Sequence, residues 1–516
     1  MAIASYTTDL VTINILDSDA TPVAVGEPTG STAGTTIATE TDHYVVGTAC
    51  ISKIFNATGI GGLGFQNGTA VTVPADGAVY MWTNFLAPNA INVQAQGGMQ
   101  ILVGNTLANY KRFYVYGDDT VPYGGWQCYA VNPANTASAT QGTPNGIWQY
   151  FGMAANVQAA VARGYPLAWD AVRAGRGSII AIDGDLANGY ANFDAMATKN
   201  DLNVTGDFNR WGIFSYNLGT YNLQGRLSLG SATTPVDFRD SNRQIFIKNT
   251  EFVTSAFNTI EILNAASVVQ WTGVGIQSLG TVSRGRLIVT DNASVNIDSC
   301  SFTDMGTFSF LSNSTVIGTT FRRCDIVDIN LSTISNCIFD DTNDTLGALR
   351  VDSIEEMSLV SGCTFTNNTT YGINLAATTT TTKSYSFSNI TFSGNAIDVY
   401  VAQPSGSVTI TITGGGTTPT FISAGATVTV VNTKFKKFTG LPEGTEIRVR
   451  QGSFTLAHSQ DVTGGFYQYD YTPSDKPAKV VFGLPGYIFE SVDIILNSTD
   501  QEIQVVYSPD PSYTIA

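Results

Sequence analysis

Apolar and polar positions repeat along residues 245–435 in a pattern that predicts a stack of similar coils. An apolar anchor recurs about every 18 to 27 residues, with one longer final interval. The eight anchors are Phe252, Ile276, Phe302, Phe321, Phe339, Phe365, Phe392 and Phe435. Five residues before each anchor lies another apolar residue, and the alternation around both positions directs the apolar side chains of two short strands to one interior.

A residue that tolerates a tight bend lies three positions before each anchor. These residues are Asn249, Gly273, Ser299, Gly318, Asn336, Gly362, Asn389 and Asn432. Each repeat therefore predicts a strand, a bend and a second strand, which suits one turn of a parallel β-solenoid. Coils about 4.8 Å apart would place like residues over like residues. In the long last interval we expect a degenerate coil around residues 408–410.

Three cysteines fall in one column of this repeat. Cys300, Cys337 and Cys363 each lie two residues before an anchor, so we expect a row of small buried side chains. The chain has no CxxC pair, and its two histidines, His43 and His458, lie outside the repeat. We therefore expect no disulfide, no metal site and no cofactor.

Composition favours an all-β protein. Of 516 residues, 13% are charged and 51 are glycine, which is typical of many short strands and turns. The net charge of −16 argues against nucleic acid or an anionic membrane surface as a partner. The first residues show no signal peptide, and no apolar run is long enough for a membrane span. A virion protein, folded in a reducing cytoplasm and released by lysis, fits these features, as does a bacterial protein exported by another route.

We expect four parts: a jelly-roll sandwich over residues 1–150, a mixed capping segment over 151–240, a parallel β-helix over 241–437 and a small β-sandwich over 438–516. In the second part, alanine-rich residues 154–162 and residues 167–174 predict helices, and residues 178–182 predict a strand. The first part resembles concanavalin-like jelly rolls through residues 47–51 and 124–129. The last part resembles transthyretin-like or immunoglobulin-like modules through residues 444–449 and 486–487.

The order of these parts resembles uncharacterised tailed-bacteriophage structural proteins with a concanavalin-like jelly roll followed by a right-handed parallel β-helix. Residues 211–214, 236–243 and 304–308 carry the likeness. It implies a non-enzymatic protein in the virion, in contact with other virion proteins of the capsid or tail. Solenoids with a flat polar face often associate about a three-fold axis, so we expect a homotrimer. Because no hinge or low-complexity linker is evident, a capsid decoration or head fibre is favoured over a tail position.

Chemistry on the solenoid would come from paired carboxylates, as in glycoside hydrolysis. The candidates follow the anchors: Asp304, Asp325, Asp328, Asp340, Asp341 and Asp344, with Arg322 and Arg323 nearby. The alternative is that these residues cap turns and keep the face soluble. A tail spike that binds or cleaves host polysaccharide is accordingly the second hypothesis for function.

Aromatic residues of the first part could bind sugar. The candidates are Trp82, Tyr114, Tyr116 and Trp126, although aromatics at alternating strand positions more often pack in a core. Sugar binding there would suit a third hypothesis, a bacterial carbohydrate-binding adhesin. Asp118 and Asp119 are too few ligands for Ca²⁺. Residues 59–64 match the spacing of a dinucleotide loop but precede no helix, so we expect a flexible turn.

Overall fold

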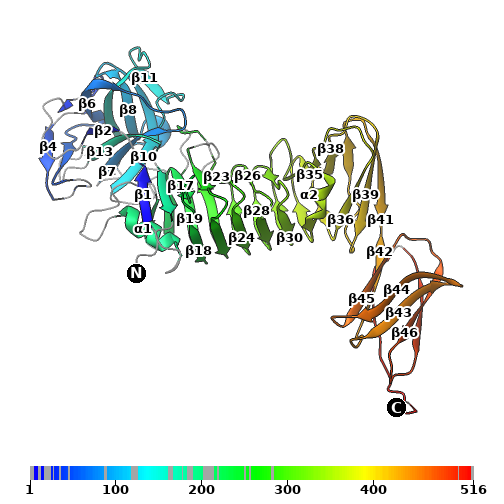
Figure 1. Cartoon of the computed structure of the whole chain (residues 1–516). Helices are drawn as coiled ribbons and strands as arrows, with labels where there is room; N and C mark the ends of the chain where they lie inside the picture. The colour runs from blue at the N-terminus through cyan, green and yellow to red at the C-terminus, as the bar shows by residue number, and fades with distance from the viewer. Residues whose placement is uncertain are drawn as a thin grey trace. The chain divides into compact units, whose positions relative to one another are not determined.

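The structure, a computed structural model, belongs to an all-β protein (Figure 1). It describes residues 5–9, 13–16, 25–26, 28–33, 36–42, 44, 47–85, 90–117, 126–160, 167–176, 178–182, 190–201, 214–217, 220–248, 252–254, 257–279, 284–497 and 499–512. The chain divides into two compact units. The first comprises residues 1–315 and 322–325, and the second comprises residues 316–321 and 326–516.

The first unit begins with a sandwich of two antiparallel sheets. One sheet contains β2 (Ile13–Leu16), β4 (Thr36–Glu40), β5 (Cys50–Ile54), β7 (Ala78–Phe85), β10 (Trp126–Val131) and β13 (Leu167–Gly175). The other contains β3 (Val25–Gly26), β6 (Gly59–Val71), β8 (Met99–Thr106), β9 (Asn109–Tyr116), β11 (Ala139–Gln141) and β12 (Trp148–Val157). The predicted N-terminal sandwich is thus confirmed, and it extends beyond residue 150 to include β13.

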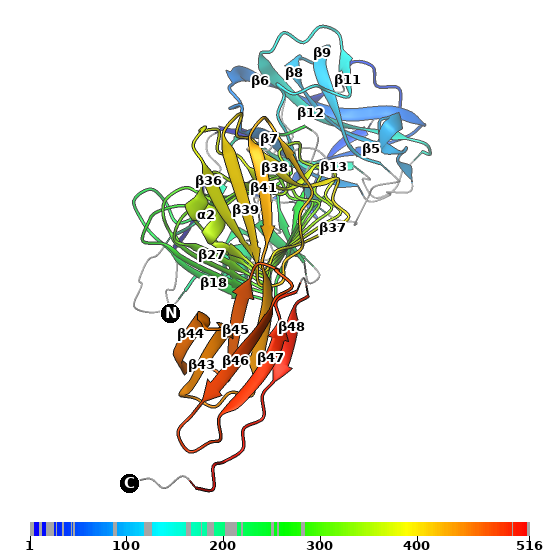
Figure 2. The same ribbon diagram turned by 90° about the vertical axis from the view of Figure 1, so that its right-hand side faces the viewer.

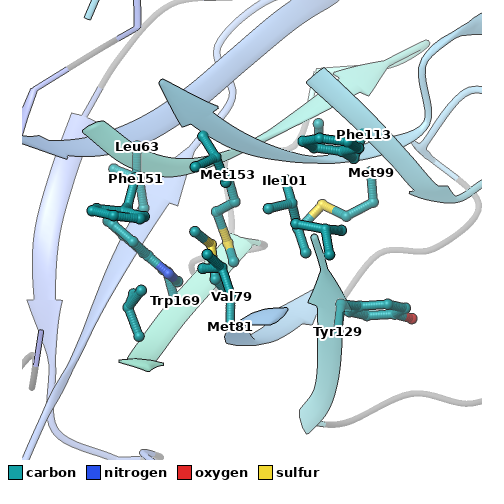
Figure 3. Packing of buried hydrophobic residues seen from close by; sticks show 14 of the residues in the cluster. Leu63, Val79, Met81, Met99, Ile101, Phe113, Tyr129, Phe151, Met153 and Trp169 are labelled. Carbon is teal, nitrogen blue, oxygen red and sulfur yellow. The ribbon is translucent and has the colours of Figure 1, made fainter. Parts of the chain in front are cut away.

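The sandwich core lies between these sheets (Figure 3). Met81 and Trp169 extend from one sheet, and Met99, Phe151 and Met153 extend from the other. All five are fully buried. Burial of side chains this large supplies the main favourable term for pairing the two sheets.

Two segments predicted to be helices are strands. Residues 154–157 belong to β12, which pairs with β6 and β8, and residues 167–174 belong to β13, which pairs with β5 and β7. Every residue of β13 is buried. A central strand that is buried on both faces lacks the alternation of polar and apolar residues that marks a strand. The alanine-rich sequence was therefore interpreted as helical.

Residues 59–64 lie in β6 and do not form the predicted flexible turn. The glycines of this segment leave space for large side chains on neighbouring strands. A Cβ on Gly64 would lie 1.8 Å from the Tyr150 hydroxyl oxygen, and a Cβ on Gly61 would lie 2.8 Å from the Phe55 ring. Close packing against these side chains therefore explains the glycine pattern.

The β-helix starts before residue 241. Each sheet of the β-helix forms one wall of its coils. In the first unit, one wall contains β14 (Ser178–Ile182), β17 (Arg226–Leu229), β20 (Thr259–Ile262), β23 (Arg286–Val289) and β26 (Phe308–Ser309). A second contains β18 (Asp237–Ser241), β21 (Val268–Thr272) and β24 (Ser294–Asp298). The third contains β16 (Thr220–Leu223), β19 (Gln244–Lys248), β22 (Gly275–Leu279) and β25 (Ser301–Thr303). Neighbours within each of these runs are parallel.

Three further elements flank these first coils. Strand β1 (Ser5–Asp9) pairs antiparallel with β14, and β15 (Phe214–Asn217) pairs antiparallel with β16. Helix α1 (Phe193–Asp201) buries Phe193, whose ring centroid lies 4.9 Å from that of Phe238 and 5.6 Å from that of Trp271. Helix α1 and β15 lie in the segment expected to cap the coils, whereas β1 comes from the part predicted to belong to the jelly roll.

The second unit continues the same coil pattern (Figure 1). One wall contains β29 (Val327–Asp328), β32 (Leu349–Val351), β35 (Tyr371–Leu375), β38 (Ile397–Val401) and β40 (Phe421–Ser423). The others contain β30 (Thr333–Ser335), β33 (Val360–Ser361), β36 (Lys383–Ser388), β39 (Ser407–Thr413) and β41 (Thr427–Asn432), and β31 (Ile338–Asp340), β34 (Thr364–Thr366) and β37 (Thr391–Ser393). Strands β27 (Ser314–Ile317) and β28 (Thr320–Arg322) contain residues of both units. The degenerate coil predicted near residues 408–410 is confirmed as β39, which pairs with β36 and β41.

The anchors stack in register, as predicted. Ile276 pairs with Phe302, and Phe339 pairs with Phe365, which pairs with Phe392. The ring centroids of Phe339 and Phe365 lie 4.8 Å apart with planes 5° from parallel. The column therefore contains nearly parallel rings separated by one strand spacing.

Two of the eight anchors are wrong. Phe252 joins the sandwich core, where its ring centroid lies 5.2 Å from that of Phe113, and the anchor of its coil is Ile245, which pairs with Ile276. Phe435 lies in β42 (Lys434–Thr439), a strand of the C-terminal sandwich. Both residues match the local spacing, but Phe252 packs into the first sandwich and Phe435 lies half-buried on a strand of the last one.

The predicted bend is confirmed at six positions. Gly273, Ser299, Gly318, Asn336, Gly362 and Asn389 all have φ between 52° and 66°. The same bend occurs one coil earlier at Asn242, whose φ is 53°, whereas Asn249 lies outside the described residues. A left-handed residue at this corner turns the chain from one wall to the next.

A second corner lies two residues after the anchor, at the turns where the sequence placed the candidate aspartates. Asp304, Arg323, Asp341, Asn367 and Gly394 occupy it, with φ between 50° and 70°. The backbone N–H at this corner donates to the next coil, as from Asp341 to the Thr366 carbonyl. Two of the candidate catalytic carboxylates are therefore corner residues.

The cysteine column is buried, as predicted. Cys300, Cys337 and Cys363 lie as free thiols against carbonyls of the preceding coil, and the Cys337 sulfur lies 3.5 Å from the Val316 oxygen. These thiols fill the space beside the corner as small apolar groups with a weak donor.

The chain ends in a small β-sandwich, seen in Figure 2. One sheet contains β42, β45 (Phe466–Tyr471) and β48 (Gln501–Gln504), and the other contains β43 (Thr445–Gln451), β44 (Phe454–Val462), β46 (Pro477–Gly483) and β47 (Glu490–Ile495). Phe438, Ile447, Val449, Val480 and Phe482 form its buried core. The predicted terminal sandwich is thus confirmed.

The phenylalanine column generates a stability prediction. Phe365 is fully buried between two stacked rings, so Phe365→Ala should lower the free energy of unfolding of the β-helix by about 3–5 kcal/mol. Phe421→Ala is the control, because Phe421 lies in the last strand of its wall and is 41% exposed. Urea unfolding followed by circular dichroism should show a far smaller loss for the control, and equal losses would contradict the buried column.

Candidate functional site

Asp304 and Asp325 form ion pairs with arginines of neighbouring coils. The Asp304 carboxylate accepts two hydrogen bonds from Arg323, at 2.7 Å from Nε and 2.8 Å from Nη2. Asp325 Oδ1 lies 3.2 Å from Arg284 Nη1, which also donates to the Arg323 carbonyl at 2.8 Å. The Arg323 hydrogen bonds hold the pKa of Asp304 below its ordinary value.

Asp340, Asp341 and Asp344 also bond to their surroundings. Asp340 Oδ1 accepts from the Thr366 hydroxyl at 2.8 Å and from the Asn367 amide at 3.1 Å. Asp344 accepts from the backbone N–H groups of Leu346, at 2.7 Å, and Ile326, at 3.3 Å. Asp341 is the corner residue described above. The carboxylates of Asp340 and Asp344 hold turns and neighbouring coils, and Asp341 does so through its backbone N–H, as in the alternative hypothesis from the sequence.

Asp328 belongs to a cluster of carboxylates with Asp352 and Glu356. Helix α2 (Ile354–Ser358) follows β32, and Ser353 caps it by accepting from the Glu356 N–H at 3.1 Å. Glu356 accepts in turn from the Asp352 N–H at 2.5 Å, so its carboxylate folds back over the residue before the cap. Arg350 lies 3.1 Å from Asp352 and 3.8 Å from Asp328.

Two carboxyl groups of this cluster have raised pKa values. Burial is the larger cause for both. The charge of Asp352 adds to the effect on Asp328, and the charges of Asp352 and Asp328 add to the effect on Glu356. Arg350 opposes the shift at Asp328. A carboxyl group of this kind keeps its proton closer to neutral pH, as a general acid must.

The sequence named Asp328 but missed Glu356. The spacing Ser353-x-x-Glu356 is the signal that could have found it, because a capping box marks the start of a helix. In the described part of the chain, no group of three or more His, Cys, Asp or Glu residues could hold a metal ion.

The aromatic candidates of the first sandwich are largely enclosed. Trp82 is 3% exposed and Tyr116 is 6% exposed, and the Tyr116 ring stacks on Tyr129 with centroids 5.1 Å apart. Tyr114 is half-buried. The Trp126 side chain, Asp118, Asp119 and His43 lie outside the described residues. Trp82 and Tyr116 therefore act as packing residues and offer no open ring face.

Comparisons with known proteins give little further information. No family model and no curated protein matches the chain. One solved structure, reported in a study of carbohydrate-binding modules from the β-sandwich superfamily, matches with 14% identity and a TM-score of 0.20. The match covers 30% of this chain and 57% of that chain, so this chain spans little more than half of its length. No helix among the described residues is long and apolar enough to cross a membrane.

The Asp304 ion pair should make stability depend on pH. Because its folded-state pKa is lowered, it stabilises above the unfolded-state value of about 3.9 and loses this effect as pH falls through the folded-state pKa. Asp304→Asn should cost about 0.5–1 kcal/mol at pH 7, since both partners are partly exposed, and almost nothing at pH 3. Asn is tolerated at this left-handed corner.

Asp341→Asn is the matched control, because Asp341 occupies the equivalent corner at φ 57°. Thermal unfolding of both variants between pH 3 and pH 7 measures the difference. A cost at Asp304 that is the same at pH 3 and pH 7 would contradict the ion-pair account.

Proposed function

We propose that the protein is a non-enzymatic structural component on the surface of a tailed-bacteriophage virion, of the capsid-decoration or head-fibre type. The observation that carries this proposal is the use of polar side chains between coils. Asp304, Asp325, Asp340 and Asp344 each bond to the backbone or side chains of a neighbouring turn or coil. These contacts suit a rigid scaffold better than an open catalytic face.

The state of the cysteines supports folding in a reducing compartment before release by lysis. All six are free and buried. Burial raises the pKa of the thiols of Cys50, Cys128 and Cys324 to about 12, which disfavours the reactive thiolate. A chain exported through an oxidising compartment would more often use such residues in disulfides. The proposal includes self-association as a homotrimer and contact with other virion proteins.

Locating the protein on purified particles tests this proposal. Particles from a lysate of the native producer, labelled with gold at a C-terminal tag, should carry label on the head. Light scattering of the isolated protein should give the mass of three chains. Label confined to tails would contradict the head assignment, and absence from particles would contradict the virion role.

A tail spike that cleaves host polysaccharide is the second candidate, favoured by the raised pKa values of Asp328 and Glu356. If the cluster is catalytic, Asp328→Asn and Glu356→Gln should each lower depolymerisation of host capsule by about 100-fold or more. Asp341→Asn should retain full activity, because Asp341 is a corner residue. Reducing-end assays measure the rates. Wild-type protein that releases no ends would exclude this candidate.

A further inference from the structure

An open groove lies on the C-terminal sandwich, far along the chain from every candidate considered above. Its volume is about 570 Å³, and its lining includes Glu446 of β43, Gln460 of β44 and Gly483 at the end of β46. The loop between β46 and β47 supplies Tyr487 and Phe489. The groove therefore combines two aromatic rings with a carboxylate and an amide.

Phe489 presents an open aromatic face at this groove. Its side chain is 76% exposed, although the residue lies in a structured connection. A Cβ on Gly483 would lie 2.6 Å from the Phe489 ring, so the ring packs directly on the Gly483 backbone. Apart from this contact, most of the residue is exposed.

The loop that carries Phe489 is held in place. Leu484, Pro485, Gly486 and Tyr487 form a turn in which the Tyr487 N–H donates to the Leu484 carbonyl at 3.1 Å, and Gly486 has φ 88°. Pro and then Gly at the centre of such a turn is the sequence of a type II turn. The Tyr487 ring packs edge-on against Tyr507, with centroids 5.6 Å apart. The site is thus preorganised, which lowers the entropic cost of binding.

The polar side of the groove is also fixed. Glu446 lies directly opposite Gly483 in the sheet, and so beside the Phe489 ring. Glu446 Oε1 lies 2.5 Å from Arg448 Nη2 and 2.9 Å from His458 Nε2. The hydrogen bonds from Arg448 and His458 hold the pKa of Glu446 below its ordinary value, so the carboxylate stays charged. Gln460 adds an amide that both donates and accepts.

We propose that this groove binds a neutral carbohydrate. A sugar ring has an apolar C–H face, which suits the open face of Phe489, and peripheral hydroxyl groups, which suit Glu446 and Gln460. An anionic sugar fits less well, because it would meet the Glu446 carboxylate on a chain of net charge −16. The inference goes beyond the proposed structural role and does not depend on it.

The test uses the full chain and defined probes. Dextran, laminarin, galactomannan and cello-oligosaccharides serve as neutral probes, and alginate serves as an anionic probe, in calorimetric titrations. We expect binding to at least one neutral probe and none to alginate. Phe489→Ala should weaken that binding by about tenfold or more, because it removes the exposed aromatic ring at the groove. Phe489→Trp should retain it, since a larger aromatic face replaces the first.

Phe454→Ala is the matched control. Phe454 is also 76% exposed and lies in the same sandwich, but it does not line the groove. This variant should bind like the wild type, and both alanine variants should keep the wild-type circular dichroism spectrum. The proposal fails if no neutral probe binds, if Phe489→Ala binds as well as the wild type, or if both alanine variants lose binding equally. None of these outcomes bears on whether the protein is found on virions.

Discussion

Each coil of the β-helix buries its interior only because a neighbouring coil lies directly against it. Phe339, Phe365 and Phe392 fill one column, with adjacent ring centroids 4.8 and 5.5 Å apart. A single coil is too thin to enclose side chains of this size, so its stability comes from the contact with its neighbours. The register must therefore be kept at every step, since a shift of one residue would turn the phenylalanines outward.

The corners keep that register. At one corner a left-handed residue such as Asn336 donates its backbone N–H to the Ser361 carbonyl of the next coil. At the other corner Asp304 and Arg323 have the same left-handed backbone, and their side chains form an ion pair between coils. The same stacking thus engages the Asp304 carboxylate, a candidate for catalysis, in a structural contact. The Asp328 and Glu356 cluster differs because α2 interrupts the regular coil beside it.

The interior of the β-helix could be predicted from the sequence because two independent patterns mark the same coils. An apolar anchor and an asparagine, glycine or serine three residues earlier both follow from the coil geometry. The second corner carries a similar signal, since Asp341, Asn367 and Gly394 are residue types that tolerate a left-handed backbone, and only Arg323 departs from it. Phe252 has the local pattern of an anchor, and only the tertiary structure places it in the sandwich core.

The other features that the sequence did not predict have two causes. Some strands are buried on both faces, and some sites join residues that are distant in sequence. Residues 154–157 and 167–174 read as helical because a central strand covered on both faces shows no alternation. Phe489 and Glu446 lie on separate strands or loops, and no spacing in the sequence indicates that they meet at one groove. Periodic structure can therefore be predicted from this sequence, whereas sites assembled from separate elements cannot.

A double-mutant cycle on Phe339 and Phe365 tests the stacked register most directly. The two residues lie in adjacent coils, and their rings are 5° from parallel. Unfolding free energies of Phe339→Leu, Phe365→Leu and the double variant should show a coupling of about 0.5–1.5 kcal/mol, as expected for an aromatic pair in contact. Losses that add without coupling would mean that the rings do not touch, and would contradict the stacked column.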